Sequence, residues 1–264
     1  MKIIFLTLIP FFFLACKSNT TSNNKEDNSK TAAKEWVSLF NRENLEGWQI
    51  KISGHEYNEN AHETFRVEDG LLKIRYDKYE NYGTQYGAIF TDKAYSDYRL
   101  KMEYRFVGDT AVGAPSWGYR DSGVQYHCQD PKTMSVEQSF PYSLELNLHG
   151  GNEDNERPTG QICANGTLIT FNGEEVRGCH QPNPTVIIKG DEWVTLEIDV
   201  QGTEIKQFIN GVEILSFSNP KLDPEHDVAK SFIKGTKVNL ESGFISLQSN
   251  SHPIDFRKIE IMEY

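Results

Sequence analysis

The chain has 264 residues, of which 12% are aromatic, and its 27 Lys and Arg against 38 Asp and Glu give a formal net charge of −11. This acidic balance, without a basic stripe interleaved with aromatic side chains, argues against nucleic acid as a partner. The length suits one large all-β domain, because β-sandwiches commonly reach about 200–250 residues as a single unit.

The first residues predict an export signal. Met1-Lys2 precedes an apolar run from Ile3 to Leu14, and a basic start followed by a short apolar core is typical of a secretory signal peptide. Phe13-Leu14-Ala15-Cys16 has the form of a bacterial lipobox. We therefore expect residues 1–15 to be a lipoprotein signal peptide and Cys16 to carry the lipid; the alternative is an ordinary signal peptide with an incidental cysteine.

Residues 16–34 differ in composition from the rest of the chain. They are polar, poor in apolar side chains and rich in Asn, Ser, Thr and Lys, which is typical of a flexible tether. The folded domain is then expected to span residues 35–264. Together these features predict a cell-envelope lipoprotein of a Gram-negative bacterium, held to the periplasmic or outer-membrane face by its lipid alone.

The domain is predicted to consist almost entirely of β-strands. Tyr98–Phe106 alternates apolar and polar side chains without a fault, which indicates a half-buried strand. Asn210-Gly211 predicts a tight type I′ hairpin turn, and lost alternation between Phe256 and Ile259 predicts a bulge in the last strand. Many short strands separated by turn residues indicate an antiparallel two-sheet sandwich or jelly roll. Further strands are expected at Leu71–Tyr76, Tyr86–Thr91, Val124–Cys128, Tyr142–His149, Leu168–Phe171, Trp193–Val200, Val212–Phe217 and Phe244–Gln248.

Three cysteines lie in the predicted domain. Cys163 and Cys179 flank a short stretch punctuated by Gly and Asn, and an exported chain folds in an oxidising compartment. A disulfide between them is therefore expected. Cys128 is left over on the apolar side of its strand, which predicts a buried, inert thiol.

Two of the predicted strands carry an unusual polar face. Ordinary solvated faces favour Lys, Glu and Thr, whereas these faces are rich in His, Gln and Asn: Gln125, His127 and Gln129 on one strand, and Ser143, Glu145, Asn147 and His149 on the other. If the strands are neighbours, His127, Glu145 and His149 converge on a metal ion or on one substrate proton. A polar face without a function is the alternative.

The spacing on the second strand argues against a familiar mechanism. Retaining glucanases of the concanavalin-like type read Glu-x-Asp-x-Glu on one strand face, whereas this chain reads Glu145-x-Asn147-x-His149. Only one carboxylate remains, so the mechanism that uses two carboxylates lacks a partner on this strand.

Short motifs follow one another through nearly the whole domain: Leu39-Phe40-Asn41, Leu45-Glu46-Gly47-Trp48, Phe65–Leu72, Asp121-Ser122-Gly123-Val124, Tyr142–Gly151, Cys163 with Cys179-His180, Gly190–Trp193, Ile209-Asn210-Gly211, Ile245–Gln248 and His252–Ile259. Each is weak alone, but in this order they resemble the bacterial 3-keto-disaccharide hydrolase family. The resemblance implies a concanavalin A-like jelly roll that hydrolyses glycosides oxidised at C3. Asp121 departs from the family's usual Asn, and Asn147-Leu148-His149 departs from the continuation of many members.

A ketone at C3 changes which residues the reaction needs. It acidifies the hydrogen on C2, so one base, a stabiliser of the enolate oxygen and an acid for the leaving group suffice. We expect Glu145 or His149 as the base, and His127 and Gln125 as enolate stabilisers or metal ligands. A divalent metal is left open, with His127, Glu145 and His149 as its candidate ligands.

The remaining candidate residues are expected to bind the sugar. Gln248 and His252 in the closing motif contact sugar hydroxyls or the leaving group, and Asp121 and Asn147 complete the predicted site. Arg120 either clamps a hydroxyl or forms a surface salt bridge.

Two other functions are alternatives to that of an enzyme. The first is a non-catalytic surface lipoprotein that captures carbohydrate by stacking sugars on Trp117 and Tyr119. The second, a purely structural envelope protein, fits the fold but leaves the His-rich polar faces unexplained.

Overall fold

The computed structural model describes residues 34–152 and 156–264. The predicted signal peptide, Cys16 and the tether up to residue 33 lie outside the described residues. Lys34–Tyr264 form one compact unit. Within the described ranges, no helix is both long and apolar enough to cross a membrane.

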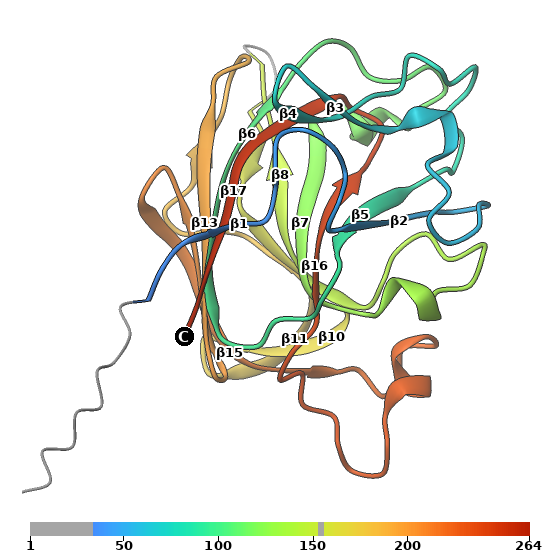
Figure 1. Ribbon diagram of the computed structural model, residues 1–264. Coiled ribbons are helices and arrows are strands. Elements are labelled where there is room, and N and C mark those ends of the chain that lie inside the picture. Colours follow the sequence, from blue (N-terminus) through green and yellow to red (C-terminus); the bar gives the residue numbers. More distant parts are fainter. Residues whose placement is uncertain (1–33, 153–155) are drawn as a thin grey trace, which may run out of the picture. The chain divides into compact units, whose positions relative to one another are not determined.

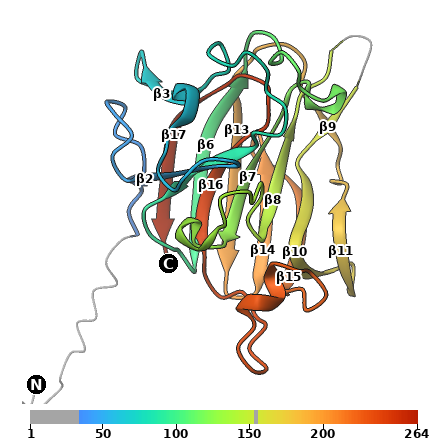
Figure 2. The same cartoon turned by 90° about the vertical axis from the view of Figure 1, so that its right-hand side faces the viewer.

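One layer of the molecule carries the polar strands identified in the sequence. Its strands run in the order β2-β5-β16-β7-β8-β10, and β11 pairs with β10. Figure 2 shows β16, β7 and β8 side by side in front of β6 and β13. The bounds are β2 (Trp48–Ile52), β5 (Gly87–Thr91), β16 (Phe244–Ser249), β7 (Asp121–Cys128), β8 (Ser143–His149), β10 (Gln161–Phe171) and β11 (Glu174–His180).

The sheet continues without interruption into the second layer, because β10 pairs with β15. The order is then β15-β14-β13-β6-β17-β4-β3, with β1 on β17 (Figure 1). The bounds are β15 (Val212–Leu222), β14 (Glu204–Ile209), β13 (Val194–Gln201), β6 (Tyr98–Phe106), β17 (Ile254–Glu263), β4 (Leu71–Ile74), β3 (Phe65–Glu68) and β1 (Val37–Ser38).

Small elements complete the chain. They are the two-stranded sheet of β9 (Pro158–Thr159) and β12 (Val186–Ile187), and the 3₁₀ turns η1 (Ala61–Glu63), η2 (Ser116–Gly118), η3 (Pro131–Thr133) and η4 (Ala229–Phe232).

The core lies between the two layers. The inward side chains of β6 and of β8, from Leu144 to Leu148, belong to one hydrophobic cluster, and burying each Leu contributes about 1.5–3 kcal/mol. Alternation fixes which face of each strand meets this core. The prediction of an antiparallel all-β sandwich is confirmed.

Two local predictions are confirmed as well. Asn210 and Gly211 both adopt positive φ, 49° and 79°, between the paired strands β14 and β15, as a type I′ turn requires. The register of β17 against β6 shifts between Arg257 and Glu260, which is the expected bulge.

Candidate functional site

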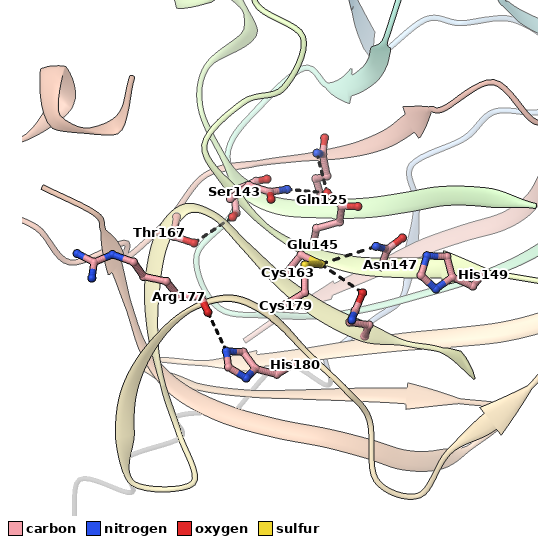
Figure 3. Close-up of a disulfide and its surroundings, with 12 residues drawn as sticks. Gln125, Ser143, Glu145, Asn147, His149, Cys163, Thr167, Arg177, Cys179 and His180 are labelled. Carbon is pink, nitrogen blue, oxygen red and sulfur yellow. Dashed lines mark hydrogen bonds between the residues drawn. A yellow bond between two sulfur atoms is a disulfide. The ribbon is translucent and has the colours of Figure 1, made fainter. Parts of the chain in front are cut away.

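Strands β7 and β8 are neighbours, and their register brings the predicted polar residues together. Gln125 lies opposite Glu145, and Asp121 lies opposite His149. Since Leu144, Leu146 and Leu148 are fully buried in the core, alternation turns Glu145, Asn147 and His149 to the outer face of β8. Figure 3 shows these three residues along the strand, beside the disulfide.

Glu145 lies at the centre of this face and is 5% exposed. Its Oε2 accepts hydrogen bonds from Asn165 Nδ2 at 2.7 Å and from Gln125 Nε2 at 3.2 Å. Burial raises the pKa of Glu145 to about 7, against the opposing effect of these hydrogen bonds. A carboxyl group with this pKa can both accept and donate a proton near neutral pH.

Gly123 makes room for the Glu145 side chain. A Cβ atom at residue 123 would lie 2.7 Å from Glu145 Oε1 and 3.0 Å from Gln248 Oε1. Both distances are shorter than ordinary van der Waals contact, so a larger residue would displace the two polar groups. The glycine of the Asp-Ser-Gly motif therefore has a steric role in the site.

The outer face opens into a pocket of about 230 Å³. Among its polar side chains, Gln248 Oε1, Asn147 Oδ1 and Asn250 Oδ1 accept no hydrogen bond from the described residues. Each of these buried amide oxygens therefore has an unused acceptor site beside the pocket. The pocket is lined by Trp117, Asp121, Phe140, Glu145, Asn147, Cys163, Asn165, Cys179, Gln248 and Asn250.

Asp121, at one end of the pocket, is held by three donors. Its oxygens lie 2.8 Å from Arg157 Nη2, 2.6 Å from Asn250 Nδ2 and 3.2 Å from His149 Nε2. His149 Nδ1 lies 3.0 Å from the carbonyl oxygen of Pro158. Each ring nitrogen of His149 therefore lies within about 3.2 Å of an oxygen atom.

The expected position of His127 is wrong. The register of β7 against β16 shifts near the end of β7, and His127 adopts φ 49°. This bulge brings Cys128 to the face of Gln125, with its Sγ 3.6 Å from Ser246 Oγ. His127 is fully buried, its ring centroid lies 6.2 Å from that of Tyr126, and it does not line the pocket.

The chemistry of His127 also differs from that of a site residue. Neither of its ring nitrogens has a hydrogen-bond partner among the described residues, and burial lowers its pKa to about 4. Cys128 is a buried free thiol, as expected, but it packs in a small cluster with Ala88, Phe90 and Met134 rather than in the main core.

Of the remaining candidates, Gln125, His149, Arg120 and His252 are not among the residues that line the pocket. Arg120 forms an ion pair with Asp191 at 2.8 Å and donates to the carbonyl of Gly190, which agrees with the salt-bridge alternative. His252 is 1% exposed, with Nδ1 2.9 Å from Thr110 Oγ1. Burial, followed by the charge of Arg120, lowers the pKa of His252 to about 4.

The three candidate metal ligands do not converge. His127 is buried away from the pocket, Glu145 is bonded to two side-chain amides, and His149 is bonded to Asp121 and a carbonyl. Within residues 34–152 and 156–264, no three His, Cys, Asp or Glu side chains are placed to hold one metal ion.

The predicted disulfide is confirmed. Cys163 and Cys179 are bonded and lie directly opposite each other in β10 and β11. Cys163 is also the register partner of Glu145 on β8. The disulfide therefore forms one wall of the pocket and ties the largely exposed strand β11 to the strand that carries Asn165.

Three contributors to the site were not predicted: Asn165, Arg157 and Asn250. Asn165 follows Cys163 by two residues, so alternation on a recognised strand would have placed it on the same face. The prediction began that strand at Leu168, after the informative residues. Arg157 and Asn250 come from segments outside the predicted strands and carry no comparable local signal.

Residues 35–262 match the family model of the 3-keto-alpha-glucoside-1,2-lyase-like domain. Two candidate glycosyl hydrolases from Parabacteroides distasonis are similar in structure. One is 16% identical with a TM-score of 0.53, over 87% of this chain and 94% of that one; the other is 21% identical with a TM-score of 0.52, over 87% and 100%.

A Bacillus subtilis protein of unknown function with a galectin-like fold is 11% identical, with a TM-score of 0.50 over 87% and 94% of the two chains. At these identities the solved structures support the fold alone. No curated protein matches the chain in sequence. The family match indicates a carbohydrate-active protein.

Proposed function

Because the chain belongs to the 3-keto-alpha-glucoside-1,2-lyase-like family, we propose that it cleaves glycosides that carry a ketone at C3. A base removes the C2 hydrogen, and the electrons of the C–H bond form an enolate with the C3 carbonyl. The enolate then re-forms the ketone and expels the substituent on C1, which leaves a C1–C2 double bond. Addition of water across this bond completes a net hydrolysis.

The position of Glu145 in the pocket and its raised pKa are the observations that support this proposal. Its carboxyl group lines the pocket, and its pKa is raised to about 7, so a large fraction is ionised at neutral pH and can take the C2 proton. Once protonated, the same group can deliver a proton to the departing oxygen. Asn165 and Gln125 hold the carboxylate in place.

Asp121, which lines the pocket, binds the sugar in this scheme. Asn250, His149 and Arg157 direct N–H groups to its carboxylate. Because these donors already compensate the Asp121 carboxylate, they hold it in place as an acceptor for a sugar hydroxyl. Gln125 has a positioning role instead, since its Oε1 accepts from Ser246 Oγ at 2.9 Å while its Nε2 holds Glu145.

The test is incubation with a methyl 3-keto-glucoside and with its unoxidised parent, followed by measurement of the released methanol. The proposal predicts release from the oxidised substrate alone, because without the ketone the C2 hydrogen is not acidic enough for Glu145. Equal release from both substrates contradicts it.

A non-catalytic carbohydrate-binding protein is the second candidate, and the exposed side chain of Trp117 at the pocket favours it. Aromatic faces stack on sugar rings without any need for a base. Binding of both methyl glucosides with cleavage of neither supports this candidate over the enzyme.

We also propose that the chain is exported and lipid-anchored at Cys16. The basic and apolar start of the sequence supports export, and the Cys163–Cys179 disulfide suits an oxidising compartment. Metabolic labelling with a radioactive fatty acid should label the protein, and Cys16→Ser should abolish the label. Equal labelling of both proteins contradicts the anchor.

A further inference from the structure

Two aromatic side chains line the pocket together with its polar groups. Trp117 and Phe140 line the pocket and are 48% and 38% exposed. Behind them lies Tyr86, whose ring stacks on Trp117 at 5.8 Å and 13° and contacts Phe140 at 5.2 Å. We call these three residues the aromatic platform. Its parallel stacking holds the Trp117 ring in one orientation while half of the side chain stays in solvent.

The loops that carry the platform are unusually apolar. Four of the eight large hydrophobic side chains that are exposed in the described residues come from segments 107–120 and 129–142, which flank β7. Besides Trp117 and Phe140, they are Val112 and Val136. Trp117 and Phe140, the two of these four that line the pocket, give it an exposed apolar surface for a ligand.

The size of the pocket indicates which part of a glycoside, the sugar ring or its C1 substituent, it can enclose. Its volume of about 230 Å³ lies below the roughly 300–1,000 Å³ of sites that enclose whole drug-sized ligands. Its polar lining residues Asp121, Gln248 and Asn250 are buried like Glu145, whereas Trp117 and Phe140 are exposed, so we take these two aromatic residues as its rim. A sugar ring placed with C2 at Glu145 therefore directs its C1 substituent out of the polar part of the pocket, to the rim.

We propose that the aromatic platform is the subsite for the leaving group, and that this group is a planar, apolar aglycone rather than a second sugar. The proposal rests on the proposed function for the position of the sugar. A second hexose could also stack on Trp117, but only one of its several hydroxyls could bond to the indole Nε1–H, and Phe140 supplies no hydrogen-bond partner. A flat ring is matched by the parallel Trp117 and Tyr86 rings.

The experiment compares methyl and benzyl 3-keto-glucosides of the same anomeric configuration, because methanol and benzyl alcohol are leaving groups of similar acidity. Their unoxidised parents serve as non-reacting ligands in titrations followed by calorimetry, which does not depend on the tryptophans that the variants remove. The proteins are the wild type, Trp117→Ala, Phe140→Ala and the control Trp36→Ala. Trp36 is 42% exposed and lines a separate hollow with Lys101 and Glu103.

The wild type should favour benzyl over methyl by about tenfold, both in Kd and in kcat/KM, as expected of aromatic stacking together with apolar burial. Trp117→Ala should remove most of this preference, Phe140→Ala part of it, and Trp36→Ala none. Equal binding of benzyl and methyl ligands by the wild type overturns the proposal.

Two further outcomes are decisive. A Trp117-dependent preference for a 3-keto disaccharide over the benzyl glycoside overturns the choice of an apolar aglycone. Preferential binding of benzyl ligands without cleavage of any 3-keto-glucoside supports the platform as a binding site, while it contradicts the proposed function.

Discussion

Asn165 on β10 donates a 2.7 Å hydrogen bond to the Glu145 carboxylate on β8. This bond and the longer one from Gln125 favour the ionised carboxylate, whereas burial favours the protonated form. Burial is the largest of these effects, and the balance gives a pKa of about 7, to which the cross-strand pair contributes.

The first prediction is that kcat/KM rises with pH through an acid limb near pH 7, where Glu145 ionises. Asn165→Ala removes a donor that lowers the pKa of Glu145, so the limb should move to higher pH. Asn239→Ala, at a separate hollow with Asp97 and Leu240, is the control. A limb that stays in place in Asn165→Ala contradicts the assignment.

The second prediction concerns the base itself. Glu145→Gln keeps the size of the side chain and an oxygen that can accept from Asn165, but it cannot take a proton. Its kcat on a 3-keto-glucoside should fall by about 10²–10⁴-fold. Glu204→Gln, at an exposed position of β14, should keep wild-type activity. If the kcat of Glu145→Gln were similar to that of the wild type, Glu145 would not be the base.

The third prediction is a pH-dependent stability difference. The pKa of Glu145 is about 7 in the folded chain and 4.5 for the model group, so the folded state retains a proton that the unfolded state has lost between these values. The stability contributed by Glu145 is therefore complete below about pH 4.5 and is lost as pH rises through 7.

Glu145→Gln cannot lose this contribution. Between pH 5 and pH 8, the free energy of unfolding of the wild type should fall relative to that of Glu145→Gln by up to about 3 kcal/mol. Urea unfolding of both proteins at the two pH values measures the change. The buried residues His127 and His252 titrate equally in both proteins, so they cancel in the comparison. A constant difference between the two proteins would show that the pKa of Glu145 is not raised.

The fourth prediction tests the room around Glu145. Gly123→Ala places a methyl group about 2.7 Å from Glu145 Oε1 and should displace the carboxylate. A displacement near 1 Å can lower the rate on the order of 10²-fold. The thermal midpoint should change less than the rate, because the atoms that must move, Oε1 and Cγ of Glu145 and Oε1 of Gln248, belong to side chains and not to the backbone. Full activity of Gly123→Ala would show that Glu145 needs no fixed position.

Alternation was sufficient to predict the face of β8, because seven consecutive residues keep a period of two and the Leu residues identify the core side. The same reasoning failed on β7, where the bulge at His127 reverses the faces of the residues that follow. The local sequence contains no Gly or Pro at residues 126–128 to signal this bulge.

The ion pairs and amide contacts of the site were less predictable than its strands. Asn165, Arg157 and Asn250 reach the site from elements far apart in the chain, and their contacts depend on the order β16-β7-β8-β10. Strand order is a long-range property that single-strand patterns do not contain. The disulfide was predictable because the short segment between its cysteines forms a local hairpin of β10 and β11.

The most direct test of the account is cleavage of a methyl 3-keto-glucoside in heavy water, followed by mass and NMR analysis of the released sugar. Removal of the C2 hydrogen and later addition of water should place deuterium on C2. Released sugar incubated without enzyme, and with Glu145→Gln, corrects for exchange beside the ketone. Deuterium at C2 above these controls is the predicted result; cleavage with no C2 label above them contradicts elimination and indicates direct displacement at C1.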